Sequence, residues 1–134
     1  MKTNVKWVGD KSFLGLSDSG HNVVFDGNGP DGGAPSPMEM VLMTVGACAS
    51  IDVVMMLDKD GRKLASCEVE ISGERVDTVP RVFKKIVLKF VVSGENISDD
   101  DAKFAVMASA DKYCSVAMML NGKVDLVFEH KLLK

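Results

Sequence analysis

The sequence predicts an α+β fold, in which strands gather in antiparallel groups and helices are inserted between the groups. Three observations support this prediction. Short segments that alternate polar and apolar residues, as half-buried strands do, recur in both halves of the chain. One long and almost wholly apolar segment is typical of a buried helix. The connections are rich in glycine, proline and aspartate, which are typical of turns and helix ends.

The first part of the chain predicts a meander of short strands. These strands cover Asn4 to Val8, Ser12 to Leu16 and Asn22 to Asp26, with turns at Gly9–Asp10 and Asp18–Gly20. A loop rich in glycine and proline follows, from Gly27 to Pro37. It is long for a plain connector in a compact domain, which favours a functional role for it.

A long helix is expected from Pro37 to Leu57. Ser36 is a suitable cap, Pro37 suits the first turn, and Glu39 lies near the positive end of the helix dipole. The middle of this segment is apolar on nearly every side, which predicts a helix that is buried all round. In a chain of 134 residues, this indicates cover from a partner subunit as well as from the chain's own sheet. The sequence therefore predicts a homodimer.

The rest of the chain predicts strands, then helices, then one last strand. The strands run from Leu64 to Arg75 and from Val82 to Val92, the helices from Asp100 to Lys112 and from Ser115 to Leu120, and the last strand from Val124 to Glu129. The predicted order is βββ-α-ββ-α-α-β, with antiparallel sheets around the long buried helix. No repeat or linker divides the chain, so residues 1–134 are expected to form a single domain.

Composition argues against several classes of partner. The net charge is −3 and there is no run of Lys or Arg, so no nucleic acid is expected. The longest apolar stretch, Met40 to Ile51, is short for a bilayer, and no signal peptide opens the chain, which predicts a cytoplasmic protein without a membrane partner. The histidines, His21 and His130, lie in different predicted elements, so no metal and no other cofactor is expected.

The chain has three cysteines, too few for a disulfide scaffold. Cys48 lies in the middle of the long predicted helix, where its small neighbours Gly46 and Ala47 leave the sulfur accessible. Cys114 lies between two helical segments, where backbone N–H groups at a helix start favour a thiolate. Both residues are also compatible with simple core packing, and core packing is the preferred interpretation of Cys67 on its alternating strand.

Together these residues resemble the OsmC/Ohr family. The resemblance rests on Ser36-Pro37-Met38-Glu39-Met40, on Gly46-Ala47-Cys48 in a buried helix, and on Tyr113-Cys114-Ser115-Val116 near the C-terminus. It implies an intertwined homodimer with active sites at the interface. It also implies an organic hydroperoxide reductase of oxidative stress defence, in which Cys48 is the peroxidatic thiol and Cys114 the resolving thiol. A dithiol such as dihydrolipoamide would reduce the resulting disulfide.

The sequence departs from the family at two residues that activate the peroxidatic thiol. No arginine precedes Arg62, and Lys11 is the nearest cationic substitute in the first hairpin. The usual glutamate would fall on Met38, whereas Glu39 is one residue later and a helix turns far in one residue.

Asp52 and several methionines add further candidates. Asp52 shares a helical face with Cys48 and is expected to cap a polar pocket, accept a proton or form a salt bridge. The methionines that could form an adaptable apolar surface, or simply fill the core, are Met40, Met43, Met118 and Met119. Two other functions stay open on the same scaffold. One is a non-enzymatic dimer that binds a small apolar ligand, and the other is a redox-sensing thiol protein.

Overall fold

The computed structural model describes all residues from Met1 to Lys134 and contains two three-stranded sheets. The chain divides into two compact units, one of residues 1–41 and one of residues 42–134, which are described separately. The order of elements is the predicted one, with a short 3₁₀ helix and a π-helix added.

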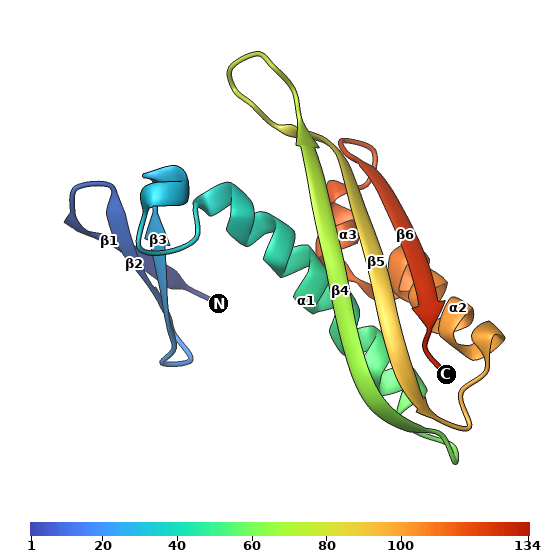
Figure 1. The fold of residues 1–134 in the computed structure, drawn as a ribbon. Coiled ribbons are helices and arrows are strands. Elements are labelled where there is room, and N and C mark those ends of the chain that lie inside the picture. Colours follow the sequence, from blue (N-terminus) through green and yellow to red (C-terminus); the bar gives the residue numbers. More distant parts are fainter. The chain divides into compact units, whose positions relative to one another are not determined.

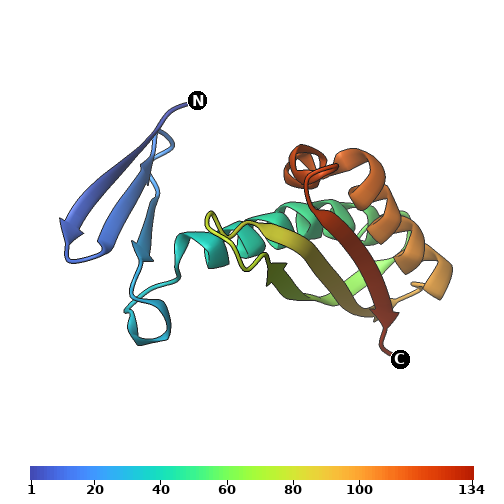
Figure 2. The same cartoon turned by 90° about the horizontal axis from the view of Figure 1, so that it is seen from above.

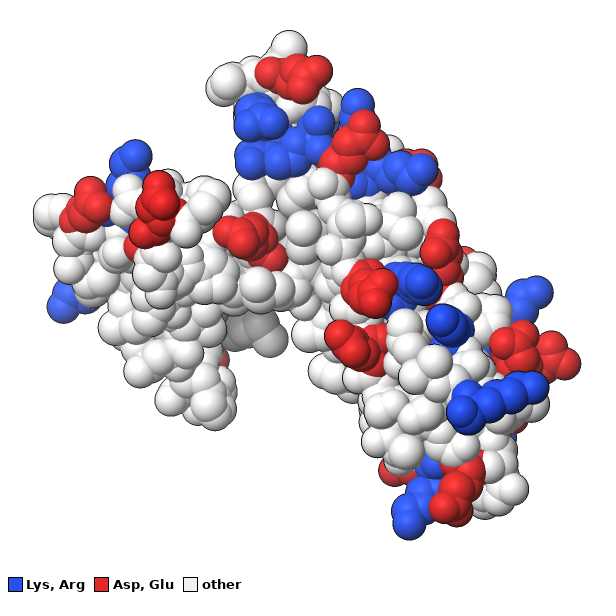
Figure 3. All heavy atoms as spheres, viewed as in Figure 1, with Lys and Arg blue, Asp and Glu red and all other residues white.

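The N-terminal unit contains the predicted antiparallel meander (Figure 1). Its strands are β1 (Thr3–Gly9), β2 (Ser12–Ser17) and β3 (Asn22–Asp26), which pair in the order β1-β2-β3. Much of this sheet is apolar yet exposed, and Trp7 keeps 64% of its surface accessible. Figure 3 shows a mostly uncharged surface on this unit, consistent with the exposed apolar side chains.

Asp26 organises the loop that follows β3, in which η1 (Gly29–Asp31) is a single 3₁₀ turn. Its buried carboxylate accepts hydrogen bonds from the backbone N–H groups of Asn28 at 2.8 Å and Gly33 at 2.9 Å. A Cβ on Gly32 would lie 2.8 Å from the Asp26 carboxyl carbon, so glycine is needed there for the close approach. The carboxylate of Asp26 thus fixes the conformation of the glycine-rich loop.

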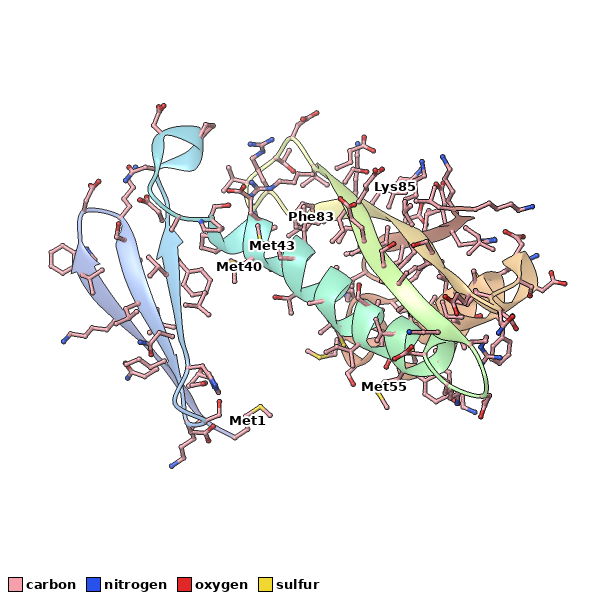
Figure 4. The ribbon with its side chains drawn as sticks, turned by 60° about the horizontal axis from the view of Figure 1, so that its bottom comes forward. Met1, Met40, Met43, Met55, Phe83 and Lys85 are labelled. Carbon is pink, nitrogen blue, oxygen red and sulfur yellow. The ribbon has the colours of Figure 1, made fainter.

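The helix α1 (Pro37–Leu57) has the predicted bounds. Within this chain it is buried along one side only, through Val45, Ala49, Val53 and Leu57. Other apolar residues are exposed, including Ile51 at 61% and Met55 at 68%, and Figure 4 shows Met55 projecting from the side of α1 that faces away from β4. The chain's own sheet therefore covers one side of α1 only, and the expected cover of its other side by a partner subunit stays a prediction.

By length and composition alone, α1 is the one helix that could cross a membrane. Its buried side, however, packs against a sheet of the same unit, as the core helix of a folded domain does (Figures 1 and 2).

The second sheet consists of β4 (Lys63–Arg75), β5 (Phe83–Glu95) and β6 (Asp125–Leu132), with β5 in the centre. The strands β4 and β5 form a long antiparallel hairpin, whereas β6 pairs parallel to β5. The sheet is therefore mixed, which corrects the expectation of antiparallel sheets throughout. A parallel neighbour requires a crossover, and the helical segments between β5 and β6 provide it.

This crossover contains α2 (Asp99–Ala108), the π-helix η2 (Ser109–Tyr113) and α3 (Ser115–Leu120). The helix α2 begins with a capping box, in which the side chains of Ser98 and Asp101 each accept a hydrogen bond from the backbone N–H of the other residue. Alternate residues of β5 form the centre of the core, which the helices cover; those with no exposed surface are Ile86, Leu88, Phe90 and Val92. The opposite face carries interspersed charges of both signs (Figure 3).

Candidate functional site

Gly46 brings the middle of α1 close to the sheet. A Cβ at this position would collide with the side chain of Ile71 on β4 and would lie 3.3 Å from that of Val69. Gly46, two residues before Cys48, therefore serves helix–sheet packing, and a role for the small neighbours in access to the sulfur stays a prediction. Cys48 itself is half-buried.

Cys114 lies at the junction between η2 and α3, and it is fully buried. Its backbone N–H donates to the carbonyl of Ser109 at 2.9 Å, the i to i−5 bond of a π-helix. Its sulfur accepts a hydrogen bond from the N–H of Ala117 at 3.4 Å, and lies 4.0 Å from the carbonyl oxygen of Val45 on α1. The residue is thus held at both its backbone and its side chain.

The thiols of Cys48 and Cys114 are neighbours, and both are free. Burial raises the pKa of the Cys114 thiol to about 11, and hydrogen bonding to Cys48 and its charge add to the rise. Hydrogen bonds from the N–H groups of Ala117 and Val116 lower the pKa of Cys114, but the effect of burial is larger. The expectation that the helix start favours a Cys114 thiolate is therefore wrong, and this thiol is protonated at neutral pH.

Asp52 lies one turn beyond Cys48 and forms no salt bridge in this chain; instead it accepts a hydrogen bond at 2.9 Å from the hydroxyl of Ser109. Ser109 is fully buried at the first position of η2. The same hydroxyl lies 3.3 Å from the carbonyl oxygen of Ala49. This contact connects the helix of Cys48 with the segment that leads to Cys114.

Two other candidates belong to the N-terminal unit. Glu39 is exposed and accepts a hydrogen bond from the N–H of Ser36 at 3.1 Å, while its own N–H donates to the Ser36 hydroxyl. Hydrogen bonding to the carboxylate from the Ser36 N–H, and next from the Ser36 side chain, holds the pKa of Glu39 below its ordinary value. Glu39 therefore caps α1. Lys11 lies in the β1–β2 turn beside Gly27, and a role for it near Cys48 stays a prediction.

The arginines of the second unit are engaged elsewhere. Arg75 donates to the carbonyl of Arg81, and Arg81 donates to that of Val76, so both stay within the β4–β5 connection. Arg62 donates to the carbonyl of Met56 and pairs with Asp101 at 3.8 Å, while its buried Nε has no partner.

A cavity of about 570 Å³ lies beside Asp52 and Arg62. Apolar side chains provide most of its remaining wall, among them Met55, Met56, Leu57, Phe104 and Tyr113. Neither Cys48 nor Cys114 lines it, so the cavity is next to the cysteine pair along α1 and not around it. Its size is in the range of small-molecule sites.

The other sulfur-containing residues are placed as follows. Cys67 is half-buried on β4 opposite Val92, and burial raises the pKa of its thiol, in agreement with a packing role. Met43 and Met118 are each 48% exposed and Met119 is 81% exposed, so these residues do not fill the core of this chain. Met40 is half-buried at the start of α1.

Sequence reasoning missed Ser109. A serine five residues before Cys114 gives no local sign that it is buried, since its partners are 57 and 60 residues away in sequence. The one available signal was Asp52 itself, because a carboxylate on an otherwise apolar helix needs a donor.

Comparison with known proteins agrees with this architecture. The model of the family described as OsmC-like protein matches residues 29–129. Protein YhfA of Escherichia coli strain K12 is 46% identical over 132 residues, which cover 98% of each chain. The crystal structure of an OsmC-like protein from Mycoplasma pneumoniae superposes with a TM-score of 0.85 at 15% identity, over 99% of this chain and 96% of that one.

A structure of the organic hydroperoxide resistance protein OhrB of Bacillus subtilis superposes with a TM-score of 0.66 at 20% identity, covering 97% of this chain and 96% of that one. At these identities the structural likenesses concern the fold. The family model covers most of the chain, and the relative from E. coli nearly all of it. The chain therefore belongs to the OsmC-like protein family.

Proposed function

We propose that this protein is a thiol peroxidase that reduces organic hydroperoxides, with Cys48 as the peroxidatic and Cys114 as the resolving residue. The observation that supports the proposal is the adjacency of the two thiols, one half-buried on α1 and one fully buried at the start of α3. A reaction that forms a disulfide needs two thiols in contact. Core packing requires neither that two thiols touch nor that they differ in exposure.

The chemistry proceeds in three steps. The Cys48 thiolate attacks the peroxide, the O–O bond breaks, and an alcohol leaves after the alkoxide takes up a proton. The sulfur is now a sulfenic acid, which Cys114 attacks; an S–S bond forms, the S–O bond breaks, and water leaves with the Cys114 proton. A dithiol then reduces the disulfide by two exchange steps and becomes a disulfide itself.

The thiol states suit this division of roles. Cys114 is protonated at neutral pH and buried, so it does not compete with Cys48 for peroxide. It is already adjacent when Cys48 becomes oxidised. Arg75 and Arg81 are bound within their own loop, so neither of them is our candidate for a cation that assists Cys48 in the same chain. Lys11 and the partner subunit remain our candidates.

The test is turnover of cumene hydroperoxide with dihydrolipoamide, followed by peroxide loss. We expect turnover in the unchanged protein, none in Cys48→Ser, and in Cys114→Ser one equivalent consumed followed by inactivation. Cys67→Ser is the matched control and should retain activity. Full activity of Cys48→Ser would overturn the proposal, and disulfide formation without turnover would favour a redox sensor.

The cavity beside Asp52 supports a second candidate, a protein that binds a small apolar ligand. It predicts binding of an apolar fluorescent probe that Phe104→Glu weakens, whatever the state of the cysteines, because Phe104 lines the cavity and is 70% exposed. A Cys48 that reacts with no peroxide, in a protein that binds the probe, would favour this function.

A further inference from the structure

We infer that Asp52 and Ser109 are positioning residues for Cys114, and that their hydrogen bond sets the rate at which the Cys48–Cys114 disulfide closes. The inference rests on the proposed roles of the two cysteines. It concerns two residues that do not react themselves.

The first step of the argument is the anchoring of η2 on α1. The buried Ser109 hydroxyl has two acceptors within reach, the carboxylate of Asp52 at 2.9 Å and the carbonyl of Ala49 at 3.3 Å. Both acceptors are on α1. Asp52 follows Cys48 by four residues and shares its side of the helix, and Ala49 directly follows Cys48 and offers its backbone carbonyl. A hydroxyl without any exposed surface needs such a partner, which makes this contact a fixed one.

The second step connects Ser109 with Cys114. The carbonyl of Ser109 accepts the Cys114 N–H at 2.9 Å across the π-helix. The hydrogen bond of a π-helix spans five residues, whereas that of an α-helix spans four. The extra residue changes the direction of the backbone that follows. The chain leaves helical geometry at Cys114, whose ψ is 106°, and α3 begins at the next residue.

The third step is the location of the sulfur. The Cys114 sulfur lies 4.0 Å from the carbonyl oxygen of Val45, three residues before Cys48. Ser109 and Cys114 thus both contact α1, on either side of Cys48 along the helix. Two contacts fix the segment better than one, and the removal of the Ser109 contact leaves Cys114 free to shift relative to Cys48.

The consequence concerns the resolving step alone. When Cys48 is a sulfenic acid, the Cys114 sulfur must approach the Cys48 sulfur from the side opposite its oxygen, in line with the S–O bond that breaks. The oxygen then leaves as water with the Cys114 proton, and a small misplacement slows such a step strongly. The attack of Cys48 on peroxide requires no motion of η2. The slow closure would lengthen the lifetime of the sulfenic acid, which excess peroxide then oxidises to a sulfinic acid.

The experiment compares the variants Asp52→Ala, Ser109→Ala and Asp52→Asn with the unchanged protein. Asparagine keeps an acceptor oxygen for the Ser109 hydroxyl, so it should restore closure. Ser115→Ala is the matched control, because Ser115 is an exposed serine directly after Cys114. Each protein receives one equivalent of cumene hydroperoxide, and rapid quenching followed by mass spectrometry gives sulfenic acid and disulfide separately.

We expect the two alanine variants to form sulfenic acid within about twofold of the unchanged rate and to close the disulfide about tenfold more slowly, as the loss of a hydrogen bond to a charged group implies. A protein that carries both Asp52→Ala and Ser109→Ala should close its disulfide no more slowly than the single variants, since both changes remove one and the same contact. Asp52→Asn and Ser115→Ala should close at the unchanged rate. Unchanged closure in both alanine variants would overturn the inference, as would slow closure in Ser115→Ala to the same extent.

A second oxidant separates this inference from the proposed function. Diamide oxidises a pair of thiols to a disulfide, is itself reduced to a hydrazine, and needs no peroxidase chemistry. If peroxide leaves Cys48 unchanged, the proposed function fails, yet slower diamide closure in Asp52→Ala still supports the positioning role. Should Ser109→Ala not fold, as circular dichroism would show, Asp52→Ala and Asp52→Asn decide the matter, because Asp52 is half-exposed.

Discussion

Cys48 and Cys114 are chemically alike but differ in their surroundings. The half-buried Cys48 is reachable from solvent, whereas Cys114 has no exposed surface. Burial also raises the pKa of Cys114 to about 11, so this thiol stays protonated over the whole physiological range. The two residues can therefore be distinguished by their reactivity before any peroxide is added.

Alkylation of the folded protein should follow this order. At pH 8, iodoacetamide is expected to modify Cys48 at least about tenfold faster than Cys114, because the thiolate is the reacting species and Cys114 lacks it. The rate at Cys114 should rise as the pH approaches 11. Peptide mass spectrometry gives both rates, and unfolding in urea provides the control in which the two rates converge. Equal rates in the folded state would contradict the assigned surroundings.

Asp26 provides a test by pH. Hydrogen bonds from the N–H groups of Gly33 and then Asn28 hold its pKa below the ordinary value. The resulting stabilisation is present above the unfolded pKa of about 4 and is lost as the pH falls through the lower folded pKa.

Asp26→Asn should therefore lower the urea midpoint at pH 7, and the difference from the unchanged protein should shrink below about pH 4. Fluorescence of Trp7, the only tryptophan, reports on the same unit. Asp31→Asn, in the same loop but exposed, is the matched control. A difference that stays constant with pH would contradict this role for Asp26.

Among the elements, the contact between α1 and β4 depends most on a single small residue. Gly46 lies where any Cβ would collide with Ile71. Glycine is unfavourable inside a helix, so its presence here indicates that close packing outweighs the loss in helix propensity.

Gly46→Ala should destabilise the protein by about 1–3 kcal/mol, the usual effect of overpacking a core, despite the better helix propensity of alanine. Ile71→Val in the same chain should recover part of this loss, because it removes the methyl group that meets the new Cβ. Urea unfolding measures both changes. The control is Ala47→Gly on the exposed side of α1, where only helix propensity changes. A stabilised Gly46→Ala would show that the helix does not approach β4 this closely.

The local sequence pattern predicted the helices and strands well. It predicted less well which elements and side chains lie next to each other. The alternation over Cys67, Val69 and Ile71 placed β4 within one residue of its observed start, and Pro37 and Leu57 are the observed ends of α1. The parallel pairing of β6 with β5 could not be predicted, because direction depends on the path of the crossover. The contact between Asp52 and Ser109 was equally hidden, since 57 residues separate the two.

At the level of the whole molecule, each unit exposes apolar surface that a folded protein normally covers. In the second unit this surface includes Ile51 and Met55 of α1, and in the first it includes Val5 and Trp7. Exposed apolar patches of this kind mark interaction surfaces. A homodimer, which the sequence predicts, is the proposed explanation.

Light scattering should find a mass twice the monomer's 14.4 kDa. Ile51→Lys combined with Met55→Lys should shift the equilibrium toward monomer, because two charges on a covered apolar face are costly. Val79→Lys is the control, since Val79 is 90% exposed in the β4–β5 connection. A monomeric unchanged protein at micromolar concentration would contradict the dimer.

The peroxidase proposal depends above all on whether peroxide joins Cys48 to Cys114. The measurement is peptide mapping of the reduced protein after one equivalent of cumene hydroperoxide. The proposed chemistry predicts one Cys48–Cys114 disulfide per chain, a free Cys67, and one equivalent of alcohol released. Unmodified Cys48 with the peroxide intact, or oxidation confined to Cys67, would contradict it.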